Sequence, residues 1–217
     1  MYKVDLHTHS EASPDGGISP EQYAKILENE KLDYIAVTDH DRVDFALGLQ
    51  KALGDRIIVG EEITTTEGEL IGLFLKERVA PNMSAYDTAH AIHDQGGLVY
   101  VPHPFETLRK GIQPESLETI AELVDIVEIH NGRAMYGKHS IKAATWAKLR
   151  GKAGASSSDA HGYKGVGYSY SIIKEVPARG SLVSSLSMTS LAHRRAPLHT
   201  FLYPKLNRLG KKIGVKK

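Results

Sequence analysis

Short apolar runs alternate with segments of helical pattern along most of the chain, and this alternation limits the possible folds more than any other feature. The runs are rich in Val, Ile and Leu with little polar alternation, as expected for strands buried on both faces. They occupy residues 2–7, 34–40, 57–63, 70–75, 98–103, 124–130 and 154–161. Strand–helix alternation predicts a parallel sheet with crossover helices, and seven runs favour a closed barrel over a short open sheet.

Helix starts are visible between several of these runs. Residues 19–21 read Ser-Pro-Glu, an N-cap residue followed by Pro at the first helical position. Residues 113–115, Gln-Pro-Glu, predict a second helix start, and residues 140–149 predict a third helix. The fold class that follows is α/β.

Composition restricts the class of protein further. The chain has 217 residues, of which 41% are hydrophobic and 24% charged, which is ordinary for a globular protein of one domain, with or without an extension. No apolar run reaches the roughly 18 residues that a membrane span needs, and the first residues lack the apolar core of a secretory signal. Cysteine is absent, which excludes disulfides and thiolate metal sites. We expect a cytoplasmic protein with no membrane partner.

Charge is distributed unevenly along the chain. After Glu175 there are nine Lys or Arg and no acidic residue. Subtracting these nine charges from the net charge of +1 leaves −8 for residues 1–175. We therefore expect a barrel domain at residues 1–175 and a short basic C-terminal extension at 176–217. The extension is either a basic surface helix packed on the acidic barrel or a contact for nucleic acid.

Polar side chains follow the apolar runs at the points where the strands should end. They are His7, His9, Asp39, His40, Glu62, His103, His130, Asp159 and His161. In parallel α/β folds the carboxyl ends of the strands meet on one face, where sites are built. These dispersed residues therefore predict a single cluster.

The residue types in the cluster indicate a metal site. His7 and His9 are two residues apart, so on a strand they point to the same side, roughly 6.5 Å apart along the chain. Taken by itself, a single His-x-His motif is more often two polar residues at a strand end than a metal site. Together with the carboxylates, however, the imidazoles form a ligand set that suits zinc, manganese or iron.

The motifs DLHTHS, VTDHD, GEEIT, VPHPF and SSDAH, in this order, resemble those of the polymerase and histidinol phosphatase (PHP) superfamily. The resemblance runs from residue 2 to about residue 162. It implies a distorted seven-stranded, TIM-like α/β barrel and two or three divalent metal ions (Mn, Zn or Fe). It also implies hydrolysis of phosphate esters by metal-activated water.

Carried over motif by motif, the resemblance implies the metal ligands. They are His7, His9 and Asp159 for a first ion, Glu62 as the bridge to a second, His103 for the second, and Asp15, His40 and His161 for a third. Glu61 is the alternative to Glu62 if the strand is shifted by one residue. Glu69 stands where relatives often carry histidine, and it is either a ligand, favouring manganese or iron over zinc, or a solvent-facing charge.

Residues 130–133 and Asp39 are the candidates for the remaining chemistry. Arg133 suits bidentate phosphate recognition, and we expect it to bind substrate with Asn131. His130 is a metal ligand, a proton donor or a core histidine. Asp39 either orients His40 or, like His130, protonates the leaving oxygen.

The favoured function is therefore metal-dependent hydrolysis of a small phosphomonoester. There is no Cys, and no Ser stands beside a positioned base, so water is the expected nucleophile. The alternative is a nucleic-acid phosphodiesterase or nuclease, or a binding module, that uses the basic extension. A non-catalytic barrel is a third hypothesis, against which the near-complete ligand set argues. The sequence does not predict the oligomeric state.

Overall fold

All seven apolar runs form strands, and two further strands join them in one mixed sheet. The computed structural model describes residues 1–134, 137–188 and 190–214. The strands are β1 (Tyr2–Asp5), β2 (Tyr34–Val37), β3 (Ile57–Thr65), β4 (Gly68–Leu73), β5 (Leu98–Val101), β6 (Ile126–Asn131), β7 (Ala153–Ser157), β8 (Ser169–Ile173) and β9 (Ser190–His193). The predicted α/β barrel is confirmed, but its sheet has nine strands rather than seven.

The strands run in the order β7-β6-β5-β4-β3-β2-β1-β8-β9. Four neighbouring pairs are parallel, namely β1–β2, β2–β3, β5–β6 and β6–β7. The prediction of a wholly parallel sheet is wrong, because β4 is antiparallel to both β3 and β5. Only Thr66 and Glu67 connect β3 to β4, and parallel strands need a crossover of a dozen or more residues. Strand β8 is also antiparallel to both of its neighbours.

The barrel closes where β7 meets β1. Beyond the ends of these strands, Thr8 forms a parallel bridge with Ala160, and the amide of Asp159 donates to the carbonyl of His7 at 2.9 Å. Nearer the other end of the barrel, two hydrogen bonds of the Ser171 hydroxyl join Ser171 of β8 to the backbone of Ser156 in β7. Closure therefore brings together the chain segments after β1 and β7, which carry five of the predicted ligands.

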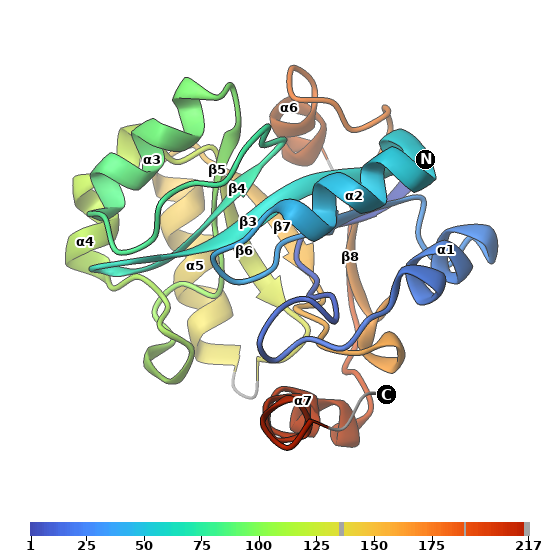
Figure 1. The fold of residues 1–217 in the computed structure, drawn as a ribbon. Coiled ribbons are helices and arrows are strands. Elements are labelled where there is room, and N and C mark those ends of the chain that lie inside the picture. Colours follow the sequence, from blue (N-terminus) through green and yellow to red (C-terminus); the bar gives the residue numbers. More distant parts are fainter. Residues whose placement is uncertain (135–136, 189, 215–217) are drawn as a thin grey trace.

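Helices cover the outside of the sheet (Figure 1). They are α1 (Pro20–Glu28), α2 (Asp44–Leu53), α3 (Ala85–Asp94), α4 (Pro114–Thr119), α5 (Gly137–Leu149), α6 (Leu182–Ser187) and α7 (Tyr203–Lys212). The predicted start at residues 19–21 is confirmed by a capping box between Ser19 and Gln22. The predicted helices at Pro114 and at residues 140–149 are confirmed as α4 and α5. None of the helices in the described ranges is long and apolar enough to cross a membrane.

The interior of the barrel divides into an apolar end and a polar end. Leu182 and Leu186 of α6 pack with Val4, Ile58 and Tyr100 in one buried cluster at the amino ends of the parallel strands. Helix α7 lies at the opposite end of the sheet, beside the loop that follows β1 (Figure 1). The segment predicted as a basic extension thus supplies β9 to the sheet and a helix to each end of the barrel.

Candidate metal centre

Strand ends place the predicted ligands at the carboxyl end of the barrel. His7 and His9 follow β1, His40 follows β2, and His103 follows β5. The side chains of His7 and His9 are fully buried. Their Nε2 atoms lie 3.1 Å apart, whereas Thr8 points away and donates to the carbonyl of Ala36. The strand-like alternation that predicts a shared side for the two imidazoles therefore holds.

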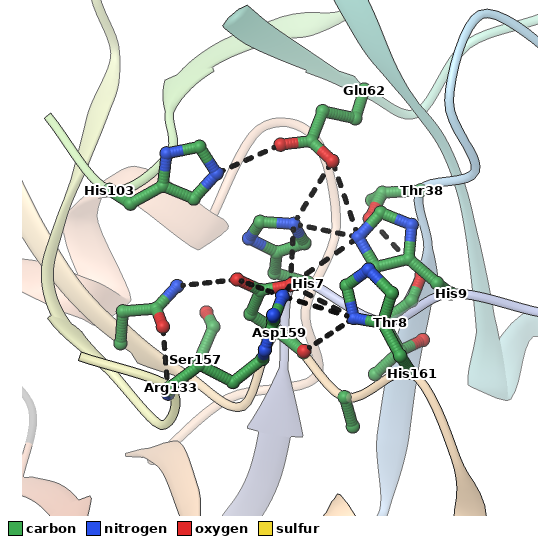
Figure 2. A network of polar contacts seen from close by, with 12 residues as sticks. His7, Thr8, His9, Thr38, Glu62, His103, Arg133, Ser157, Asp159 and His161 are labelled. Carbon is green, nitrogen blue, oxygen red and sulfur yellow. Dashed lines mark hydrogen bonds and ion pairs between the residues drawn. The ribbon is translucent and has the colours of Figure 1, made fainter. Parts of the chain in front are cut away.

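Glu62 contacts three of the predicted histidine ligands, His7, His9 and His103 (Figure 2). Its Oε1 is 3.0 Å from Nε2 of His103, and its Oε2 is 3.4 Å from Nε2 of His7 and 3.2 Å from Nε2 of His9. The two carboxylate oxygens thus face different ligand groups, which is the geometry that a bridging carboxylate needs. Glu61, the alternative one residue earlier, turns the other way and accepts a hydrogen bond from the amide of Val79.

A second group of ligands surrounds Asp15. Its Oδ2 lies 3.6 Å from Nε2 of His40 and 3.4 Å from Nε2 of His161. Asp15 is buried in the loop after β1, where Ser13 donates a hydrogen bond to its Oδ1. The loop therefore brings Asp15 to the place that the resemblance implied.

Asp159 joins these two groups. Its Oδ1 is 3.5 Å from Nε2 of His9 and 3.3 Å from Nδ1 of His161. Its Oδ2 accepts a hydrogen bond from Arg109 at 2.5 Å, and Nη1 of Arg133 lies 3.3 Å from its Oδ1. Two guanidinium groups therefore stand beside the cluster on one side.

The donor atoms converge closely enough to hold several ions. Four overlapping groups have ligand atoms within 4.8 Å of one another: His9, Asp15, His40 and His161; His7, Glu62 and His103; His7, His9 and Asp159; and His40, Glu62 and Glu69. All donors are imidazole nitrogens or carboxylate oxygens, and this set fits zinc, manganese or iron. Facing imidazole nitrogens such as those of His7 and His9 gain a common partner when a cation lies between them.

Glu69 belongs to this cluster rather than to the surface. It is 4% exposed, and its Oε1 lies 3.8 Å from Nδ1 of His40. The alternative of a solvent-facing charge is therefore wrong. Burial, with the nearby charge of Glu62, raises the pKa of Glu69 to about 7. A cation bound in the group would offset the repulsion between the carboxylates of Glu62 and Glu69 and would favour the ionised form of Glu69.

Asp39 and His130 do not face the cluster. Both carboxylate oxygens of Asp39 accept hydrogen bonds from Ser10, from its amide at 2.7 Å and its hydroxyl at 2.5 Å. Within the described ranges no hydrogen bond joins Asp39 to His40, so the predicted orienting contact is not formed. His130 stacks on His193 of β9, with ring centroids 4.6 Å apart. These contacts are those of structural side chains.

Asn131 also differs from its predicted role in binding substrate. It is buried, and its Oδ1 accepts hydrogen bonds from Nη1 of Arg109 and the amide of Arg133, both at 2.8 Å. Its Nδ2 donates to Glu128 and Asp159. The side chain is therefore occupied in holding neighbouring residues, and it leaves Arg133 as the member of this pair that can meet a substrate.

Two residues that contact the predicted ligands, Glu128 and Arg109, were not predicted from the sequence. Glu128 is buried in β6, where it contacts Nδ1 of His7 at 3.2 Å and accepts a hydrogen bond from the amide of His103 at 2.6 Å. A glutamate inside the apolar run 124–130 was the available signal. Arg109 ends a single 3-10 turn, Thr107–Arg109, after β5, and no sequence pattern marks it. Carboxylates that hold metal-binding histidines fix the ring orientation, as Glu128 does for His7.

The cluster forms the floor of an open cavity of about 400 Å³. Four basic residues line the cavity, namely Arg109, Lys110, Arg133 and Arg208. Together with the buried ligands they form a site with cation-binding groups below and anion-binding groups around it. This combination defines a class of metal-dependent enzyme that acts on anionic substrates.

Comparison with known proteins agrees with this class. The model of the PHP domain family matches residues 5–149, about two thirds of the chain, and the chain belongs to this family. The resemblance inferred from the motifs is thereby confirmed. The curated protein MJ0417 of Methanocaldococcus jannaschii is 34% identical over 176 residues, which cover 77% of this chain and 69% of that protein.

Solved structures share the fold. One is a two-domain protein from Bacteroides vulgatus that contains a predicted PHP-like metal-dependent phosphoesterase, with a TM-score of 0.65 and 18% identity over 95% of this chain and 69% of that one. Another is the lesion-specific Endonuclease Q of Pyrococcus furiosus, with a TM-score of 0.61 and 15% identity over 88% of this chain and 57% of that one. At these identities the likeness concerns the fold alone.

The position of Glu128 generates a first prediction. Glu128→Gln keeps the shape of the side chain but removes the charge that holds His7. We expect metal affinity to fall by roughly 10- to 100-fold, because this is the usual effect of losing a carboxylate behind a metal-bound histidine. Manganese titration of metal-free protein measures it. Glu122→Gln, at an exposed glutamate, is the matched control, and equal affinities for the two variants would remove the role assigned to Glu128.

The buried histidines generate a pH prediction. Burial disfavours the charged form of His9, but hydrogen bonds to Asp159 and Glu62 outweigh burial and raise its pKa to about 10 in the metal-free protein. His9 is then protonated at pH 7 and must lose its proton to bind a metal ion. We expect metal binding to release protons and metal affinity to rise with pH. Calorimetric titration in two buffers of different ionisation enthalpy measures the release, and identical heats in both would contradict it.

Glu69 generates a third prediction. Glu69→Gln should weaken metal binding, because an anionic donor is lost from the group with His40 and Glu62. Glu69→His should restore part of the affinity, since imidazole also binds these metals. The exposed Glu77→Gln is the control. If Glu69→Gln binds metal as the wild type does, Glu69 is not a ligand.

Proposed function

We propose that the chain is a metal-dependent hydrolase of phosphate esters whose preferred substrates are small phosphomonoesters. The observation that carries this proposal is the convergence of imidazole and carboxylate donors around Glu62, on the floor of a cavity lined by arginine and lysine. Divalent ions held there would neutralise phosphate charge and lower the pKa of a water molecule from 15.7 towards about 7. The family that the chain belongs to supports the same reaction class.

In this proposal the nine predicted ligands together bind two or three such ions. Glu62 is the bridging residue in this proposal, because its two oxygens face separate groups of donors. His7 and His9 are shared between neighbouring groups. Glu128 holds His7 from behind and fixes the direction of its Nε2.

Arg133 binds the substrate phosphate in this proposal. Its guanidinium lines the cavity and lies within 3.4 Å of both Asp159 and His161, beside the predicted ions. A planar guanidinium there can donate two parallel hydrogen bonds to a phosphate. Arg109 is more firmly held, by Glu106, Asn131 and Asp159, and it adds positive charge at the same wall.

A nuclease or nucleic-acid phosphodiesterase is the second candidate. Two observations favour it: the likeness of fold to Endonuclease Q and the basic C-terminal segment. Arg194, Arg195, Lys205 and Lys212 of this segment are exposed and could meet a phosphate backbone. Each phosphate neutralised would contribute roughly −0.7 to −0.9 to the slope of log affinity against log salt.

The reaction itself is the fourth prediction. Metal-loaded protein should release phosphate from p-nitrophenyl phosphate, with strong stimulation by manganese and loss of activity on adding EDTA. Oxygen from solvent should appear in the released phosphate, because water is the nucleophile. Arg133→Lys should raise KM, since a lysine makes no bidentate contact. Asp159→Asn, a variant of a predicted metal ligand, is the control whose activity is compared with that of the wild type.

A substrate panel of monoesters, nucleotides and oligonucleotides separates the two candidates. Release of phosphate from small monoesters, unaffected by replacing Arg194 and Arg195 with Ser, supports the phosphomonoesterase. Cleavage confined to oligonucleotides, with a salt slope that falls in this variant, supports the nuclease instead. Metal-loaded protein that cleaves nothing on the panel, with wild type and Asp159→Asn indistinguishable, contradicts both.

A further inference from the structure

The inner face of α7 is built into the rim of the metal centre. Asn207 is 4% exposed, although the helix lies at the outer edge of the barrel. Its Nδ2 donates hydrogen bonds to the backbone carbonyls of Asp15, at 2.8 Å, and His161, at 2.9 Å. One side-chain amide therefore joins the loop after β1 to the loop after β7, at two residues predicted to bind the same ion.

Two glycines make this close approach possible. A Cβ atom on Gly17 would lie 2.9 Å from Nδ2 of Asn207. A Cβ atom on Gly162, the residue after His161, would lie 2.6 Å from Cδ2 of the Tyr203 ring. The first and fifth residues of α7 thus rest directly on backbone next to Asp15 and His161. Neither glycine has a positive φ, so close packing, and not an unusual turn, requires them.

Charged side chains of α7 reinforce the contact. Nη2 of Arg208 lies 2.8 Å from Oδ2 of Asp15. Nζ of Lys211 donates to the carbonyl of Gly16 at 2.9 Å and to the carbonyl of Ser13. Both basic residues thus contact the loop at residues 13–16, which itself lies outside the strands and helices.

The remaining ligands do not depend on this helix. Strands and their ends carry His7, Glu62 and His103, which form a group that includes neither Asp15 nor His161. Asp15, by contrast, lies in the loop between β1 and α1. The group of His9, Asp15, His40 and His161 is therefore the one whose geometry α7 controls.

We propose that α7 is a structural part of the metal centre and that Asn207 is a positioning residue for the ion held by His9, Asp15, His40 and His161. The helix fixes the distance between the two loops that carry Asp15 and His161. This inference rests on the metal centre of the proposed function but not on the identity of the substrate. It assigns the basic C-terminal segment a role in ion binding within the barrel.

The test is a count of bound ions in the full-length protein. Asn207→Leu keeps a side chain of similar size but removes the donor that joins the two loops. We expect manganese-loaded Asn207→Leu to hold one ion fewer than the wild type, or to bind its weakest ion roughly 10- to 100-fold less tightly. The ions at His7, Glu62 and His103 should remain. Elemental analysis after gel filtration gives the count, and Asn207→Gln, which keeps a donor, should recover part of it.

Two further variants separate positioning from general damage. Gly162→Ala pushes Tyr203 and α7 away from His161 without touching Asn207, and it should lower the same ion count. Lys205→Ala, at an exposed residue of the same helix, should match the wild type. Thermal unfolding of the metal-free proteins confirms that each variant folds.

The outcomes distinguish this inference from the proposed function. If Asn207→Leu and Gly162→Ala fold and bind as many ions as tightly as the wild type, α7 has no part in the metal centre. If both variants lose every ion together, α7 supports the barrel as a whole, and the specific role of Asn207 is also overturned. Wild-type protein that binds no metal ion overturns the proposed function and this inference together.

Discussion

The buried carboxylate of Glu62 is the constraint on which the rest of the site depends. An ionised carboxylate removed from water costs several kcal/mol unless partners compensate for it. Here His7, His9 and His103 stand within 3.4 Å of its two oxygens, and opposite charge holds the pKa of Glu62 well below its usual range although burial alone would raise it. The imidazoles gain a partner by the same contacts. These mutual contacts stabilise the buried carboxylate and imidazoles. When metal ions bind, the imidazoles can release their protons and bind the ions instead.

The distorted barrel follows from the need to assemble this cluster. A short hairpin between β3 and β4 pairs Glu69 with Thr64 and brings the Glu69 carboxylate into one group with Glu62. Strand β4, which is antiparallel to both neighbours, separates the parallel strands β1–β3 from the parallel strands β5–β7. Closure between β1 and β7 places Asp159 beside His7 and His9. Two apolar clusters, a larger one that packs helices such as α1, α2 and α3 on the sheet and a smaller one inside the barrel beside α6, supply hydrophobic stabilisation that offsets the cost of the buried charges.

The sequence predicts the strands and most of the site because both signals are local. Each ligand motif follows an apolar run, and the end of a run marks the end of a strand. What it misses depends on longer-range geometry. In β6 the register shifts between Glu128 and His130, so simple alternation fails there. Glu128 and Asn131 face the cluster, while His130 stacks on His193. Asp39 was expected to orient His40 or to act as an acid, and it instead accepts hydrogen bonds from Ser10.

The contacts of the C-terminal segment were also beyond sequence reasoning. The positive charge of this segment suggested either a surface helix or a contact for nucleic acid. The charge pattern does not indicate which side chains face the barrel. Asn207, an uncharged residue in a basic stretch, makes the contact that matters for Asp15 and His161. Such a contact joins residues 192 positions apart along the chain, so it becomes visible only in the folded structure.

In the proposed centre several cations share Glu62 at the carboxyl end of this barrel. Anomalous diffraction from crystals of the protein grown with manganese tests it most directly. We expect at least two anomalous peaks in the cluster, with an oxygen of Glu62 bound to each of two ions and His103 and His7 on opposite sides. Maps with no peak among these residues, or with peaks only elsewhere on the protein, would show that Glu62 bridges no ions.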